Sequence, residues 1–198
     1  DSIRNAIPSI NSIYLAGGFG RGEGTVIKIG NQWRPLNDYD IWVVSDKFTD
    51  LDSVRLNKLK RELAISFGID YVDIAAITKN NLREMPPTIE NFEMLNGAML
   101  LWGYEVRESA PRFGLEDIKK YEFVRLVCNR AAGILTGFLP ERMNDGIYML
   151  NQKMKADIAA GDCMVYLHGN YSSKYSERYL QLAEIFQNNK NANIFSKS

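Results

Sequence analysis

The sequence predicts an α+β protein in which a small mixed-sheet domain, residues 1–110, precedes an α-helical bundle, residues 115–198. Two observations lead to this prediction. Short β-like apolar runs alternate with helix-like segments up to a break near Ser109-Ala110-Pro111, and only helical spacing follows it. The 198 residues are ample for a hydrophobic core and fit one large domain or two small ones.

The strands of the first domain are predicted from short apolar runs that turn residues bound. The first strand ends at Gly17-Gly18, and a hairpin turns at Gly30-Asn31. In order, strands are expected at residues 12–16, 25–29, 32–34, 41–44 and 71–77, and a last apolar run lies at 99–103.

One helix of this domain is predicted over residues 54–67, where apolar side chains recur at helical spacing. Gly68 stands where a C-terminal cap belongs. Pro86-Pro87 breaks the chain, and a further helix is expected between this break and the run at 99–103.

Three apolar stripes at helical spacing predict the bundle of the second half. They comprise Ile118, Tyr121, Val124, Cys128, Ala131 and Leu135; then Ile147, Leu150, Met154 and Ile158; and finally Tyr179, Leu182, Ala183 and Phe186.

Residues 14–23 join an apolar strand to a glycine-rich turn. Glycine allows a backbone to come close to a phosphate group, and N–H groups at a helix start bind phosphate oxygens. Gly17 and Gly18 are therefore candidate phosphate contacts.

Two carboxylates, Asp38 and Asp40, stand at the start of the apolar run that ends at Val44. Alternate residues of a strand point to the same side, so both side chains are expected to face one way. Paired carboxylates suit hard divalent cations. A phosphate-binding turn followed by paired acids indicates metal-assisted phosphoryl or nucleotidyl transfer.

These strings, in this order, resemble the nucleotidyltransferase superfamily related to DNA polymerase beta. Residues 17–23 are similar to its Gly-Ser-x-Ala-Arg-Gly-Glu turn, and residues 37–41 to its Ser-Asp-x-Asp motif. Asp73 matches the third acidic residue, which the family places on a neighbouring strand. The resemblance extends over about residues 1–105. The second half resembles, with weaker motifs, the helical bundles of small-molecule adenylyltransferases and minimal nucleotidyltransferases.

The resemblance implies a role for each matching residue. Asp38, Asp40 and Asp73 would be catalytic and would hold two Mg²⁺ ions about 3.5–4 Å apart. Asp73 would also be the general base for the acceptor hydroxyl. Gly17, Gly18, Arg21 and Glu23 would be the nucleotide-binding residues of the turn. Arg21 would pair either with a phosphate oxygen or with Glu23 and the turn itself.

Asp70 is the alternative third acid. It lies closer to the turn at Gly68, which is more typical of a surface residue, so Asp73 is preferred.

Two departures from the family pattern matter for the site. Gly18 replaces the usual serine, which removes a hydroxyl from the phosphate contact and keeps the backbone donor. Residues 19–37 separate Gly18 from Asp38, a longer spacing than the commonest one, and the hairpin at 25–34 accounts for the insertion.

Further candidate nucleotide contacts come from the helical half. Tyr171 lies in the hydroxyl-rich segment 166–178, and Lys153 belongs to the preceding helix. A polar inter-helix loop with solvated charges is the alternative interpretation of this segment. His168, the single histidine, precedes a glycine at a predicted helix end, which favours a structural role over catalysis.

Composition excludes several classes of protein. Lys plus Arg and Asp plus Glu are each 24, so the net charge is zero. A zero net charge argues against binding of long nucleic acid. Cys128 and Cys163 form no zinc motif and are expected to be buried, reduced thiols of a cytoplasmic protein. No apolar stretch reaches the ~20 residues of a membrane span, and no signal peptide is evident.

The sequence therefore predicts a magnesium-dependent nucleotidyltransferase that moves an NMP from an NTP, with ATP expected, to a hydroxyl of a small molecule or a protein. Two alternatives remain: a nucleotide-binding regulatory or antitoxin-like module with little turnover, and a structural domain of a longer protein. A homodimer is also left open, because such a cleft can need residues from a partner subunit.

Overall fold

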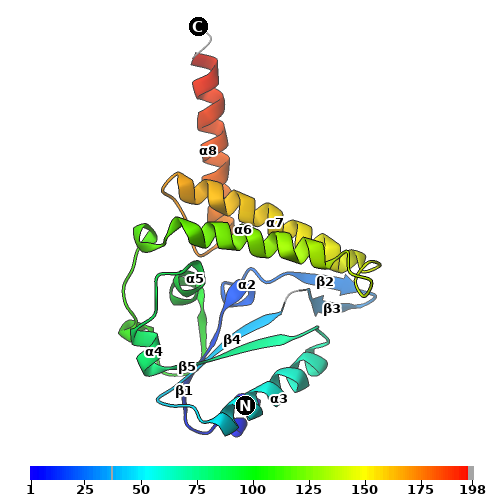
Figure 1. Ribbon diagram of the computed structural model, residues 1–198, viewed down its shortest axis with the longest axis vertical. Coiled ribbons are helices and arrows are strands. Elements are labelled where there is room, and N and C mark those ends of the chain that lie inside the picture. Colours follow the sequence, from blue (N-terminus) through cyan, green and yellow to red (C-terminus); the bar gives the residue numbers. More distant parts are fainter. Residues whose placement is uncertain (37, 196–198) are drawn as a thin grey trace. The chain divides into compact units, whose positions relative to one another are not determined.

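A computed structural model describes residues 1–36 and 38–195, with side chains up to residue 188. The chain divides into two compact units, residues 1–86 with 90–112 and residues 87–89 with 113–198 (Figure 1). The first unit holds a mixed four-stranded sheet with helices, and the second is helical. The predicted α+β class is confirmed. None of the described helices is long and apolar enough to cross a membrane.

The first unit contains all the strands that the structure describes. Its elements are α1 (Ser2–Ala6), β1 (Ile10–Leu15), α2 (Gly17–Gly20), β2 (Val26–Ile29), β3 (Gln32–Pro35), β4 (Tyr39–Ser45), α3 (Asp50–Phe67), β5 (Val72–Thr78), α4 (Lys79–Arg83), α5 (Ile89–Gly97) and β6 (Met99–Gly103). The predicted hairpin is present as β2 and β3.

The helix α3 begins four residues earlier than its apolar spacing predicts. Thr49 caps it, because its hydroxyl accepts the N–H of Asp52 while the Asp52 carboxylate accepts the N–H of Thr49. The helix ends at Gly68, whose φ of 67° is the left-handed conformation predicted for this position.

The sheet has the order β5-β4-β1-β6. The pairs β1–β4 and β1–β6 are antiparallel, whereas β4 and β5 are parallel. Because parallel neighbours need a crossover connection, α3 links the two strands. This connection places Asp40 directly opposite Asp73 in the register of β4 and β5.

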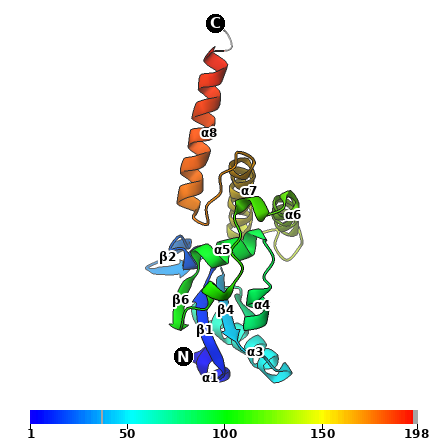
Figure 2. The same cartoon turned by 90° about the vertical axis from the view of Figure 1, so that its left-hand side faces the viewer.

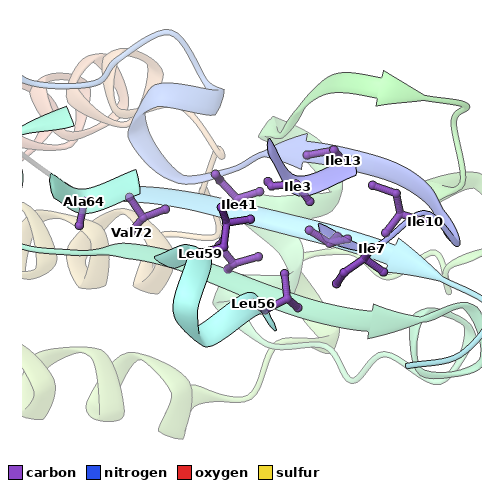
Figure 3. Packing of buried hydrophobic residues seen from close by; sticks show 11 residues of the cluster. Ile3, Ile7, Ile10, Ile13, Ile41, Leu56, Leu59, Ala64 and Val72 are labelled. Atoms are coloured by element: carbon purple, nitrogen blue, oxygen red, sulfur yellow. The ribbon is translucent and has the colours of Figure 1, made fainter. Parts of the chain in front are cut away.

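Each face of the sheet carries its own hydrophobic cluster, since alternate residues of a strand point to opposite faces. Ile41 and Val43 of β4 pack with α1 and α3, and Figure 3 shows this cluster from close by. Trp42 and Val44 of the same strand pack with α4 and α5 on the other face. The helices on the two faces can be followed in Figure 2.

A polar network borders the second cluster, where buried Tyr14 meets the more exposed Glu105 and Arg107. The hydroxyl of Tyr14, which is fully buried, donates to Glu105 at 2.8 Å and accepts the N–H of Val106 at 2.9 Å. Arg107 donates to the same carboxylate through Nε at 2.9 Å and a second guanidinium nitrogen at 2.7 Å. These hydrogen bonds, first those of Arg107, lower the pKa of Glu105 to about 2.

The second unit consists of α6 (Lys120–Thr136), α7 (Gly146–Leu167) and α8 (Tyr175–Phe195), with a short turn of helix at Leu115–Asp117. The predicted helices are present, and most residues of the three apolar stripes are exposed. Val124, Leu135 and Leu150 are 62%, 68% and 57% exposed. Helical periodicity identifies an apolar face without showing what covers it.

Ile118 of the first stripe is buried, and the rest of the core of this unit lies on other positions. Phe123 stacks on Tyr166, with ring centroids 3.8 Å apart, and Ala159 and Val165 are buried. The expectation of two buried thiols is corrected, because Cys128 is exposed. Cys163 is half-buried, and burial raises the pKa of its thiol.

The Glu105 network predicts a specific acid sensitivity. A carboxylate whose pKa is lowered by folding, here from 4.5 to about 2, stabilises the fold fully above its unfolded pKa and loses this effect as the pH falls towards the folded pKa. Between about pH 5 and pH 2, urea denaturation should show a steeper loss of stability for the wild type than for Glu105→Gln. Glu108→Gln, which removes a nearby exposed acid, is the control, and equal slopes for all three proteins would contradict the assignment.

Candidate active site

The candidate site begins with the register of two neighbouring strands. Asp40 of β4 and Asp73 of β5 are Cα partners in the parallel pair. Neighbouring strands lie ~4.8 Å apart, and register partners of a parallel pair present their side chains on the same side. Asp38 precedes Asp40 by two residues. The three predicted acids therefore gather around the start of these two strands.

The glycine turn lies directly against one of these acids. Gly17 has a φ of +61°, and a Cβ atom there would stand 2.0 Å from Oδ2 of Asp40. The backbone holds the same junction, because the N–H of Ala16 donates to the carbonyl of Asp40 at 2.7 Å. Only glycine therefore leaves room at position 17 for the Asp40 carboxylate in this orientation.

The other glycines of the turn differ in what they require. At Gly18 a Cβ would meet its nearest atom at 3.5 Å, which is ordinary contact, so packing does not explain why glycine replaces the family's serine. At Gly20 a Cβ would stand 2.1 Å from the carbonyl oxygen of Leu15. Position 20 therefore tolerates no side chain in this backbone, although the family motif has alanine there.

Tyr71 is a site residue that the sequence analysis missed. Its hydroxyl donates a hydrogen bond to the Asp38 carboxylate. The pKa of Tyr71 is raised, first of all by burial. The charge of Asp38 and its hydrogen bond add to the shift, as do the charges of Asp40 and Asp73. The sequence did contain one signal for Tyr71. It stands two residues before Asp73, and alternate residues of a strand place their side chains on the same side.

A cation accompanies the third acid. Lys60 of α3 donates to Oδ1 of Asp73 at 3.0 Å. A cavity of about 350 Å³ lies beside this ion pair and contains the alternative acid Asp70. It is lined by Asn57, Lys60, Arg61, Ala64, Asp70, Tyr71, Val72 and Asp73.

The three acids have the right chemistry for a metal ion, but their side chains are not arranged around one point. Carboxylate oxygens from Asp38, Asp40 and Asp73 are the ligands that Mg²⁺ prefers. Across the described residues, however, no three Asp, Glu, His or Cys side chains stand close enough together to hold a metal ion. The ligand type fits Mg²⁺, and the side chains would have to move to surround one.

Arg21 pairs with carboxylates in this structure, and pairing with Glu23 is one of the two roles that the sequence left open. Its side chain is 2% exposed and lies 3.7 Å from Glu23 and 3.2 Å from Glu93. Its described contacts are therefore with carboxylates that hold the turn against α5. Glu93 was not identified from the sequence, because 72 positions separate it from Arg21 and no local pattern links them.

The remaining candidates belong to the helical unit. Lys153 pairs with Asp157 at 2.7 Å and is exposed. Tyr171 is buried, where its hydroxyl accepts a hydrogen bond from Arg178 and its ring meets Phe123 edge-on. His168 ends α7, as predicted, and Nδ1 lies 2.8 Å from the Met164 carbonyl oxygen.

Comparison with known proteins found similar solved structures, among them the two that follow. No family model matches the chain, and no curated protein matches it. A mutant of the MntA-HpeT toxin–antitoxin is 20% identical, with a TM-score of 0.38. A toxin–antitoxin with AMP-PNP is 19% identical, also with a TM-score of 0.38. Each alignment covers 66% of this chain and 88% of the other. At these values the likeness carries no argument about activity.

The buried position of Arg21 predicts a structural effect of its loss. Arg21→Gln leaves Glu23 and Glu93 without their cation, so we expect the free energy of unfolding to fall by about 3 kcal/mol. Arg34→Gln, which changes an exposed arginine of β3, should alter it by less than about 0.5 kcal/mol. Urea denaturation measures both, and an Arg21 variant as stable as the wild type would show that the two contacts do not support the fold.

Proposed function

We propose that this chain is a magnesium-dependent nucleotidyltransferase, which moves an NMP from an NTP, with ATP preferred, to a hydroxyl of a small molecule or a protein. The observation that supports the proposal best is the pairing of Asp40 with Asp73 in register, beside the Gly17 turn. The motifs that resemble the family's turn and its acids thus lie together in space.

In the proposed reaction, the acceptor oxygen forms a bond to the α-phosphorus of the NTP. The bond from that phosphorus to the bridging oxygen breaks, and pyrophosphate leaves with the electron pair. The acceptor hydroxyl gives its proton to the Asp73 carboxylate, which at 58% exposure is open to an incoming acceptor.

The other residues of the site have positioning roles in this proposal. Tyr71 orients the Asp38 carboxylate through its hydrogen bond. The N–H groups of Gly17 and Gly18, the first of α2, are the proposed contacts for phosphate oxygens, because such groups have no partner within their own helix. Asp38, Asp40 and Asp73 would hold Mg²⁺, which when bound neutralises triphosphate charge and acidifies the attacking hydroxyl.

Two observations favour the alternative, a nucleotide-binding module with little turnover. The ion pair with Lys60 engages the carboxylate that the reaction needs as a base, and the three acids do not surround one point. Calorimetry with a non-hydrolysable NTP, together with a separate assay of pyrophosphate release from NTP, distinguishes the enzyme from the binding module. The alternative predicts affinity for the nucleotide without release of pyrophosphate.

The proposal predicts which carboxylates catalysis needs. With each labelled NTP, Mg²⁺ and candidate acceptors, the wild type should release pyrophosphate and transfer label, and Asp40→Asn should do neither. Asp73→Asn should lower kcat by about 10²–10⁴, the usual contribution of a general base. Asp70→Asn is the matched control from the same cavity and should retain activity. Turnover that survives Asp40→Asn would refute the proposed function.

The contact between Gly17 and Asp40 gives a second prediction. Gly17→Ala and Gly22→Ala both place a side chain at positive φ, so each should lose about 1–2 kcal/mol of stability. Only the new methyl at position 17 would displace the Asp40 carboxylate, since position 22 has no atom within 4 Å. We therefore expect Gly17→Ala alone to weaken Mg²⁺-dependent nucleotide binding, as measured by calorimetry. Equal affinities for both variants would disprove this role of Gly17.

A further inference from the structure

The ion pair between Lys60 and Asp73 joins α3 to the edge strand β5. The Nζ of Lys60 lies 3.0 Å from Oδ1 of Asp73, and the two side chains are 30% and 58% exposed. The pair spans 13 positions of the sequence, so it depends on how α3 packs beside β5 and not on helical spacing.

The Lys60 ammonium is bound to the acid that is in register with Asp40. Asp38, Asp40 and Asp73 carry like charges around one end of the two strands, and Tyr71 contacts only the first of them by a hydrogen bond. Clustered carboxylates repel one another unless a cation balances them. In this structure Lys60 supplies that balance at Asp73.

We propose that Lys60 is a positioning residue that acts as the counter-ion of Asp73 in the metal-free protein and that a divalent cation must displace it to recruit this carboxylate. The inference rests on the proposed function, because it concerns the same metal site. It accounts for the observation that three acids lie in one region and yet do not form a metal-holding group among the described residues.

The surroundings of Lys60 suit such an exchange. An exposed ion pair is weak, so a dication at the site can outcompete it. The cavity of about 350 Å³ beside the pair offers the flexible lysine side chain room to withdraw. Asp70 lines this cavity, and its carboxylate can meet the released ammonium.

Arg61 provides a matched comparison for Lys60. It is the next residue of α3, carries the same charge and lines the same cavity, whereas the ion pair described for Asp73 is with Lys60. A long-range effect of positive charge on metal affinity would therefore appear in both variants. Direct competition for Asp73 would appear only when Lys60 is changed.

The test measures binding of Mn²⁺ alone to the full chain, by electron paramagnetic resonance of the free ion, without nucleotide. Lys60→Met should tighten Mn²⁺ binding by up to about fivefold, the range expected for removal of an exposed ion pair. Arg61→Met should have a smaller effect, and Lys60→Arg should not tighten binding. In the Asp73→Asn background, Lys60→Met should no longer change the Mn²⁺ affinity. Thermal unfolding of each variant confirms that it is folded.

Each other outcome is decisive. Equal Mn²⁺ affinities for the wild type and Lys60→Met, or equal tightening by Lys60→Met and Arg61→Met, would overturn the counter-ion role while the proposed function stands. Tighter binding that persists in the Asp73→Asn background would also overturn it. Tighter binding that needs Asp73, without nucleotidyl transfer in the presence of NTP, would support the counter-ion role and refute the enzymatic one. No Mn²⁺ binding by any variant would overturn both.

Discussion

The parallel pairing of β4 with β5 determines which side chains can meet at the candidate site. Because α3 carries the chain from the end of one strand to the start of the other, Asp40 and Asp73 come to the same level of the sheet. A shift of one residue in this register would turn Asp73 to the opposite face, among the side chains that pack against α3. That shift is prevented by the burial of four side chains of these strands, Ile41, Val43, Val72 and Ile74. The hydrophobic core therefore determines that Asp40 and Asp73 lie side by side.

The same register concentrates negative charge, and the fold compensates for it locally. Tyr71, just before β5, donates a hydrogen bond to Asp38. Lys60, on the neighbouring helix α3, pairs with Asp73. On the other side of the turn, Arg21 lies between Glu23 and Glu93. The ion pairs of the glycine turn thus centre on a buried arginine, whereas the ion pair of Asp73 with Lys60 is open to solvent. This difference suits a rigid turn beside carboxylates that can accept a ligand.

Local sequence patterns predicted the strands and the long helices and singled out the three acids, but they did not predict the short helices α1 and α4. The apolar spacing over residues 54–67 and Gly68 predict α3 and its end, and Gly30-Asn31 predicts the hairpin. Tyr71 and Lys60 escaped prediction because their roles depend on packing between β5 and α3, which no short string encodes. The exposure of most stripe residues escaped prediction for a related reason. Leu135 and Leu150 follow helical spacing and are exposed, because spacing alone does not show which neighbour covers a face.

The central claim is that Asp38, Asp40 and Asp73 form a metal site for nucleotide chemistry beside the Gly17 turn. Its most direct test is a crystal structure with Mn²⁺ and a non-hydrolysable NTP, with the metal located by anomalous scattering. The account predicts Mn²⁺ at roughly 2.1 Å from carboxylate oxygens of Asp38 and Asp40, with the triphosphate against Gly17 and Gly18. Nucleotide bound elsewhere, or Mn²⁺ that contacts none of the three acids, would contradict it.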